Sequence, residues 1–221
     1  IMENLIPSVR LFETCASKNA KVIFISSGGT VYGKNGLDIH EEDSPKHPFG
    51  SYAASKLCIE NYLEVYGAQK KLDYRIVRLA NPYGPYQRTN TGLGVIATFV
   101  ERSLTTGCID LYGTGDTVRD YIYSCDAATA LVAIADYAGE ERILNLGSGE
   151  GHSLLDVIKV IEEVSGRKFE INHVPMRKSD IERSVLDITR LNKCFPDLKL
   201  KGFNEGIKDF YYYMKGNLKD N

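Results

Sequence analysis

The sequence predicts an α/β fold in which helices cover a parallel β-sheet, and three observations lead to this prediction. Residues 21–25 form a short apolar run between turn signals, a pattern typical of a strand buried in a parallel sheet. Apolar residues with helical spacing precede this run over residues 5–15 and follow it after residue 52. Loops rich in glycine and small hydroxyl residues follow the predicted strands, at the position where open α/β sheets bind ligands.

In the first 90 residues we expect two helix–strand pairs. The first helix covers about residues 5–17 and leads into the strand at residues 21–25. The second helix begins at Tyr52, continues to about Lys70 and is followed by a strand over residues 74–79. A loop punctuated by proline and glycine then covers residues 80–86.

The remaining chain alternates between helical periodicity and short apolar runs. We expect Asp126 to cap one helix, whereas Ser153 and Asp156 form a capping box for another that ends at Gly166. Residues 175–187 read as a polar loop. The expected helices are 92–106, 126–137, 153–166, a short one after Asp187 and 204–215, and the expected strands are 110–113, 118–123, 142–147 and 170–174.

Composition excludes several classes of partner. The 221 residues are 43% hydrophobic and 25% charged with a net charge of -2, which is ordinary for a globular protein with a sizeable core. There is no basic run, so we expect no nucleic-acid partner, and no apolar run approaches the ~18 residues that span a bilayer, so we expect no membrane partner. Five scattered cysteines indicate reduced thiols and a cytoplasmic protein, and four histidines without ligand spacing predict no metal.

Tyr52 and Lys56 are the first candidates for chemistry. Four residues apart on a helix, they lie on one face, about one turn from each other. An ordinary tyrosine has a pKa of about 10, so a phenolate near pH 7 needs roughly 4 kcal/mol of extra stabilisation. One cation ~4 Å away supplies about that much at an effective dielectric constant of ~20. Such pairs also occur by chance on many helices, so the neighbouring motifs decide whether this pair is a catalytic candidate.

Five motifs in order carry a resemblance to a known family. They are Ser-Ser-Gly-Gly-Thr-Val-Tyr-Gly at 26–33, Tyr-x-x-x-Lys at 52–56, Arg-x-x-Asn-Pro-Tyr-Gly-Pro at 78–85, Val-Arg-Asp-Tyr-Ile at 118–122 and Asn-Leu-Gly-Ser-Gly at 145–149. In this order they resemble the extended short-chain dehydrogenase/reductases, and among them the nucleotide-sugar epimerases of the UDP-glucose 4-epimerase type. The resemblance covers essentially the whole chain.

The resemblance implies a partial Rossmann-like, doubly wound parallel sheet that holds NAD, with a small α/β part for the substrate. Residues 1–90 correspond to the second half of the NAD-binding domain. Residues 91–221 correspond mainly to the nucleotide-sugar part, with 125–165 returning to the Rossmann domain. The family's glycine-rich phosphate loop and its acidic ribose ligand do not occur in this sequence, and the first strand resembles the family's fourth. We therefore expect that the family's amino-terminal strands, roughly 90 residues, are missing and that NAD binds weakly.

The implied function is a UDP-sugar 4-epimerase that oxidises C4 transiently with NAD and acts on UDP-glucose and UDP-galactose or on N-acetylated UDP-hexoses. Tyr52 would take the proton of the 4-hydroxyl, and Lys56 would favour its phenolate form and contact the nicotinamide ribose. The family's third catalytic hydroxyl falls on Gly28. Thr30 is the expected substitute, while Ser27, a water or slower chemistry are the alternatives.

The resemblance also implies the remaining contacts. The residues matching cofactor positions, besides Tyr52 and Lys56, are Asn4, Ser26, Ser27 and Ala80. The residues matching substrate positions are Gly28, Asn81, Gly94, Val95, Asp110, Tyr112, Arg119, Arg177, Asp180 and Ser184. Arg119 and Arg177 match a pyrophosphate clamp, for which guanidinium groups are suited. The small Ser184 would leave room for a 2-acetamido group.

Several alternatives stay open. A sugar-nucleotide 4,6-dehydratase would carry an Asp-Glu pair where Gly29 and Thr30 stand. A decarboxylase or uronate epimerase of the same fold, or a non-catalytic nucleotide-binding protein, also agrees with the motifs. Family members commonly form homodimers through a four-helix bundle, to which residues 1–17 and the Tyr52 helix would contribute.

Overall fold

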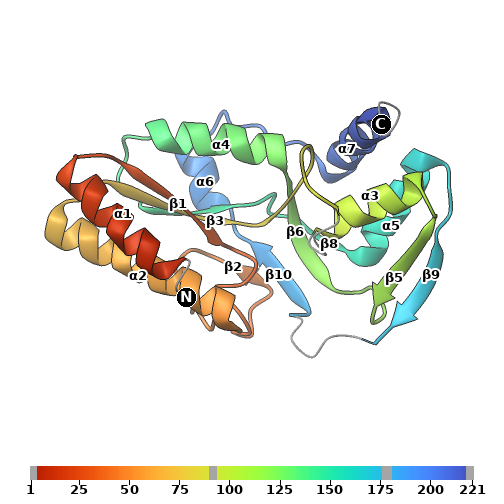
Figure 1. The fold of residues 1–221 in the computed structure, drawn as a ribbon, viewed down its shortest axis with the longest axis horizontal. Coiled ribbons are helices and arrows are strands. Elements are labelled where there is room, and N and C mark those ends of the chain that lie inside the picture. The colour runs from red at the N-terminus through yellow and green to blue at the C-terminus, as the bar shows by residue number, and fades with distance from the viewer. Residues whose placement is uncertain (1–3, 90–93, 176–180, 218–221) are drawn as a thin grey trace.

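The computed structural model describes residues 4–89, 94–175 and 181–217, which form two lobes with a strand-rich connection (Figure 1). The elements are α1 (Leu5–Ser17), β1 (Val22–Ser27), β2 (Ile39–His40), α2 (Ser51–Lys70), β3 (Tyr74–Leu79), β4 (Asn81–Tyr83), α3 (Val95–Leu104), β5 (Cys108–Tyr112), β6 (Val118–Tyr123), α4 (Ser124–Asp136), β7 (Ile143–Leu146), β8 (Gly151–Ser153), α5 (Leu154–Ser165), β9 (Glu170–Val174), β10 (Arg183–Leu186), α6 (Thr189–Cys194) and α7 (Phe203–Asn217).

The first lobe confirms the predicted parallel sheet with helices on both faces. Its strand order is β1-β3-β7, and every pair is parallel. Side chains alternate along β3, so that Ile76 packs with α1 and α2 while Val77 packs with α4 on the other face. Figure 1 shows α1 and α2 on one side of β1 and β3, with α4 on the other.

Strand β1 is an edge strand in the described sheet, where a buried position was expected. It pairs with β3 on one side, and Ile25 is 41% exposed. The apolar run therefore predicted the strand correctly, whereas half of its side chains are only partly covered.

The connection between the lobes contains strands that the sequence did not suggest. Its order is β2-β10-β6-β4, with β8 antiparallel to β6. Strand β10 lies within the stretch expected to be a polar loop, and that expectation was wrong: Val185 and Leu186 are each 1% exposed. Two apolar residues among polar ones are too short a run to signal a strand, and the pairing with β6 stabilises it.

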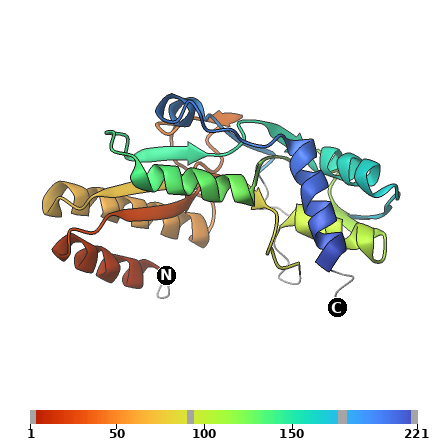
Figure 2. The same ribbon diagram turned by 90° about the horizontal axis from the view of Figure 1, so that it is seen from above.

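In the second lobe α3, α5 and α7 pack around one apolar cluster, beside the parallel pair β5–β9. Figure 2 shows the backbone of this lobe from above, with α7 in dark blue. The predicted capping box of α5 is confirmed, because Ser153 Oγ accepts a hydrogen bond from the Asp156 amide and the Asp156 carboxylate accepts from the Ser153 amide. Gly166 ends the helix in the left-handed conformation with φ 70°.

The predicted cap of α4 was wrong. The helix begins at Ser124, so Asp126 lies in its first turn, where its carboxylate accepts a hydrogen bond of 2.6 Å from the Lys201 amide. Helix α4 and strand β7 lie with the first sheet, whereas α5 packs in the second lobe. The division into an NAD-binding domain and a substrate part stays a prediction.

Among the described helices, none has the length and apolar character needed to cross a bilayer.

Candidate functional site

Tyr52 and Lys56 occupy one face of α2, as their spacing predicts. Lys56 Nζ lies 5.8 Å from the centre of the Tyr52 ring, and Tyr52 is 55% exposed. Lys56 is held at the carboxyl end of β1, because its Nζ donates a 2.7 Å hydrogen bond to the Ile25 carbonyl and lies 4.8 Å from the centre of the Phe24 ring. The ammonium is therefore anchored beside the phenol at the edge of the sheet where ligands bind.

The surroundings of Lys56 affect its charge in opposite directions. Partial burial lowers the pKa of the Lys56 ammonium, and the nearby Glu60 carboxylate partly opposes this effect. Glu60 lies one further turn along α2, so its carboxylate favours the protonated amine that the predicted role of Lys56 requires.

The glycine-rich loop after β1 leaves no room for a side chain at Gly28. Its amide donates a 2.8 Å hydrogen bond to the Leu79 carbonyl. A Cβ at Gly28 would lie 2.6 Å from Leu186 Cδ1 and 2.9 Å from the Arg78 carbonyl oxygen. A serine or threonine at this position would therefore require the surrounding atoms to move.

Thr30 presents a buried hydroxyl that lacks a hydrogen-bond partner among the described residues. Such groups are uncommon in folded proteins because an unpaired buried hydroxyl is costly. The Thr30 hydroxyl thus has unused hydrogen-bonding capacity, and its catalytic role stays a prediction.

The predicted cofactor residues differ in how exposed their side chains are. Ser26 is 3% exposed and its hydroxyl donates to Glu60, so its side chain points into the core and only its main chain remains available to a cofactor. Ala80 is buried beside β7, because its amide donates to the Leu146 carbonyl at 2.8 Å. Ser27 is partly exposed, and Asn4 is exposed at the start of α1.

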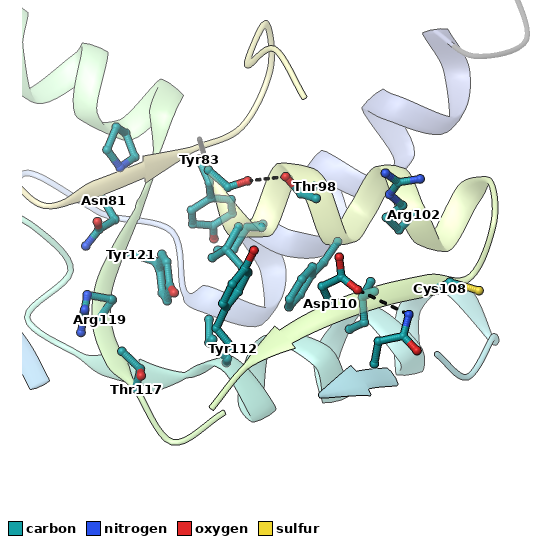
Figure 3. Close-up of a pocket in the computed structure, with 18 of the residues that line it drawn as sticks. Asn81, Tyr83, Thr98, Arg102, Cys108, Asp110, Tyr112, Thr117, Arg119 and Tyr121 are labelled. Carbon is teal, nitrogen blue, oxygen red and sulfur yellow. Dashed lines mark hydrogen bonds between the residues drawn. The ribbon is translucent and has the colours of Figure 1, made fainter. Parts of the chain in front are cut away.

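A cavity of about 900 Å³ brings together six of the ten predicted substrate residues (Figure 3). These six are Asn81, Gly94, Val95, Asp110, Tyr112 and Arg119. Figure 3 shows Asn81 and Arg119 at one end and Asp110 and Cys108 at the other. The cavity thus has the Asn81 amide and the Arg119 guanidinium on one side, and the Asp110 carboxylate with the Arg102 guanidinium on the other.

The other four predicted substrate residues are not in this lining. Gly28 lies in the loop after β1, and Arg177 and Asp180 lie outside the described residues. Ser184 is 3% exposed on β10, paired in register with Arg119.

Asp120 holds the Asn81 and Arg119 end of the cavity in place, and the sequence did not single it out. Its carbonyl accepts a 2.8 Å hydrogen bond from Asn81 Nδ2. Its buried carboxylate accepts from the Ser148 amide and hydroxyl at 2.8 Å, and from the Gly149 and Leu186 amides. Burial raises the pKa of Asp120, while these hydrogen bonds oppose the rise. The available signal was a carboxylate in the middle of the predicted strand 118–123.

Sequence reasoning also missed polar residues on the far side of the cavity. Asn172 Nδ2 donates to Asp110 Oδ1 at 3.4 Å, because β5 and β9 pair in parallel with these residues in register. Thr98 and Arg102 line the cavity from α3. The place of Asn172 depends on strand pairing and that of Thr98 and Arg102 on helix packing, neither of which residue spacing reveals. In the described ranges, histidine, cysteine and acidic side chains form no cluster suited to a metal ion.

Comparison with known proteins shows the family to which this chain belongs. The model of the NAD dependent epimerase/dehydratase family matches residues 1–147. A UDP-glucose 4-epimerase of Mycolicibacterium smegmatis is 35% identical over 92% of this chain and 66% of its own length. A dTDP-4-dehydro-6-deoxyglucose reductase of Escherichia coli is 35% identical over 86% of this chain and 60% of its own length.

The fold is likewise similar to that of a solved enzyme. The structure of UDP-glucose 4-epimerase from Thermotoga maritima with UDP-glucose superimposes with a TM-score of 0.91 at 33% identity, over 97% of this chain and 70% of that one. The described elements are therefore Rossmann-like, as predicted. The chain spans less than two thirds of the length of the two curated relatives.

Proposed function

Because this chain belongs to the NAD-dependent epimerase/dehydratase family, we propose that it carries the substrate site and the proton-transfer residues of a UDP-sugar 4-epimerase. The observation that carries the proposal is the cavity, which gathers six residues that are scattered between positions 81 and 119.

The two ends of the cavity suit the two ends of a nucleotide diphosphate. Arg119 and the Asn81 amide can donate to phosphate oxygens, and a guanidinium group binds phosphate with charge-assisted hydrogen bonds. At the other end, Asp110 offers acceptor oxygens beside the Asn172 amide, and the Tyr112 ring offers a flat face. This end would take the uridine.

Tyr52, Lys56 and Thr30 would carry the proton transfer. Tyr52 as phenolate takes the proton of the sugar 4-hydroxyl and later returns it. Lys56 supplies the positive charge that favours the phenolate, and the unpaired Thr30 hydroxyl hydrogen-bonds the sugar oxygen in place of the side chain missing at Gly28.

The described residues suit the nicotinamide end of NAD. Lys56 is anchored at the carboxyl edge of the parallel sheet, and the unpaired Thr30 hydroxyl lies in the loop that follows β1. NAD, when bound, supplies the group that accepts hydride from C4 and gives it back. We expect weak binding of NAD to these 221 residues, since their sequence has no glycine-rich phosphate loop, and a titration followed by fluorescence would measure it.

A second candidate is a nucleotide-sugar 4-ketoreductase, favoured by the relative from Escherichia coli and by Gly28. In that reaction Tyr52 gives one proton to a 4-keto oxygen. A ketoreductase transfers hydride once, whereas an epimerase transfers it away from C4 and back. The ketoreductase therefore does not need a second catalytic hydroxyl for a return step.

We propose that Ser184 determines how large a sugar substituent the site accepts. Its small side chain is buried beside Arg119, and we propose that it leaves space for a 2-acetamido group. Turnover of UDP-glucose compared with UDP-N-acetylglucosamine tests this, and complete rejection of the acetamido sugar would contradict it.

We also propose a homodimer formed through α1 and α2. Both helices expose large apolar side chains, with Leu11 at 56%, Tyr62 at 41% and Val65 at 46%. Light scattering after size-exclusion chromatography would give a mass near twice 24.6 kDa.

The reaction class is tested in D₂O with NAD and UDP-galactose, followed by ¹H NMR. An epimerase yields UDP-glucose that keeps its C4 hydrogen, without net consumption of NAD. A ketoreductase converts only a 4-keto sugar and uses one reduced cofactor per turnover, while a dehydratase introduces carbon-bound deuterium. Absence of UDP-glucose at saturating NAD would contradict the epimerase proposal for this chain.

A further inference from the structure

We propose that the buried Glu60–Arg78 ion pair is a positioning element, which holds the glycine-rich loop and the Tyr52–Lys56 face of α2 in one fixed arrangement. This inference rests on the proposed function only in so far as those two segments carry the chemistry. Neither Glu60 nor Arg78 is assigned any contact with substrate or cofactor.

The pair itself is fully enclosed. Arg78 Nη2 lies 2.7 Å from Glu60 Oε2, and Arg78 Nε lies 3.2 Å from both carboxylate oxygens. The exposed fractions of the two side chains are 1% and 2%. A buried ion pair is rarely more stabilising than apolar side chains of the same size, so stability alone is a poor reason to place one here.

The pair binds the glycine-rich loop at both ends. The Ser26 hydroxyl donates to Glu60 Oε1 at the beginning of the loop. Arg78 Nη1 donates to the Tyr32 hydroxyl at 3.0 Å near its end. Gly28 and Thr30 lie between these two anchors, so the position of the unpaired Thr30 hydroxyl depends on both.

The same pair also fixes α2. Glu60 follows Lys56 by four residues and Tyr52 by eight, so the three side chains lie on one helix face. Lys56 donates to the carbonyl of Ile25, and the next residue, Ser26, donates to Glu60. Two successive residues of β1 thus hold two successive turns of α2, and Arg78 fixes the second of these contacts from β3.

A second buried arginine on the same strand provides a control, although its carboxylate partner, Asp73, is 45% exposed and also pairs with Lys21 and Arg142. Arg75 is also buried on β3 and pairs with Asp73 at 2.9 Å. Its hydrogen bonds go to Asp73 and to the carbonyls of Tyr74, Tyr137 and Gly139, at the opposite end of the strand. Neutralising Asp73 therefore disturbs a buried arginine without disturbing the candidate site.

The test compares Glu60→Gln with Asp73→Asn in the 221-residue chain by amide hydrogen exchange at pH 7. In E60Q we expect exchange over residues 26–33 and 51–60 to rise by about tenfold or more relative to α5, since a buried guanidinium without a carboxylate partner disrupts its neighbours. In D73N these two segments should change no more than α5. The pKa of Lys56, measured by NMR of the dimethylated amine, should fall in E60Q and stay unchanged in D73N, which a merely structural role of Glu60 would not produce.

Uniform exchange in E60Q across all three segments, or an unchanged pKa of Lys56, would overturn the inference. If E60Q does not fold, Ser26→Ala removes one anchor only. Its exchange should then rise over residues 26–33 relative to α5, and wild-type exchange there would count equally against the proposal. No readout uses catalysis or NAD, so failure here is distinct from failure of the proposed epimerase activity.

Discussion

Gly28 and Gly29 are adjacent glycines that should respond in opposite ways to an added methyl group. Both have φ outside the left-handed region, so alanine meets no backbone strain at either position. At Gly28 the new Cβ would lie 2.6 and 3.1 Å from the two Leu186 δ carbons and 2.9 Å from the Arg78 carbonyl. At Gly29 the nearest atom is 3.6 Å away, in the Asn81 amide.

The expected change in the free energy of unfolding follows from these distances. Leu186 is 1% exposed and packed in the first lobe's core, so it can yield only by displacing other core side chains. Overpacking of this kind costs about 1–3 kcal/mol. The entropy that alanine removes from the unfolded chain offsets about 0.4–1 kcal/mol at both positions. We therefore expect Gly28→Ala to destabilise by roughly 1–2 kcal/mol and Gly29→Ala to be neutral or slightly stabilising.

Urea denaturation followed by circular dichroism measures both free energies of unfolding. A cycle with Leu186→Ala identifies the cause, because the methyl at position 28 can occupy part of the space that Leu186 leaves. The coupling should be favourable by about 1 kcal/mol or more. Equal stability of G28A and G29A would refute the steric reasoning, and with it the explanation for the missing hydroxyl at position 28.

Three further outcomes are expected. Asp120→Asn should destabilise by about 1–3 kcal/mol in urea titrations, because an amide cannot accept from Ser148, Gly149 and Leu186 together; wild-type stability would contradict this. Ser153→Ala should cost about 1 kcal/mol at pH 7 through loss of the cap. The Ser153 hydrogen bonds lower the pKa of Asp156, so the stability that comes from its ionised carboxylate is present above the ordinary aspartate pKa. That stability is lost as the pH falls through the pKa of Asp156 in the folded protein. A difference in unfolding free energy between S153A and wild type that is equally large at pH 2.5 would contradict this linkage. Asn81→Ala should weaken UDP binding about tenfold in calorimetry, since one hydrogen bond to a charged group is lost, whereas Thr117→Ala serves as a cavity-lining control with little effect.

The parts of the fold that local patterns determine were predictable. The capping box of α5 needs only Ser153 and Asp156 three residues apart, and the Tyr52–Lys56 face needs only helical spacing. Matching motifs identified the six predicted cavity residues, and the packing of β4, β5, β6 and α3 brings them together.

The wrong predictions, a loop at β10 and a helix cap at Asp126, have one physical cause. In both places tertiary contacts determine the local structure. Strand β10 forms because β6 and β2 pair with it. The Asp126 carboxylate accepts a hydrogen bond from the amide of Lys201, 75 residues away, and does not cap the start of its own helix. Separately, the Ser26 hydroxyl donates to the buried Glu60 carboxylate, while the predicted cofactor contact of Ser26 stays a prediction.

The central claim is that Tyr52 transfers the proton at C4 of a UDP-sugar. The most direct measurement is the rate of UDP-galactose conversion by wild type and Tyr52→Phe at saturating NAD, with UDP-sugar affinity measured in parallel. We expect the variant to lose about 10²–10⁴-fold in rate while its affinity stays within a few-fold of wild type. Equal rates in the two proteins would contradict the assignment.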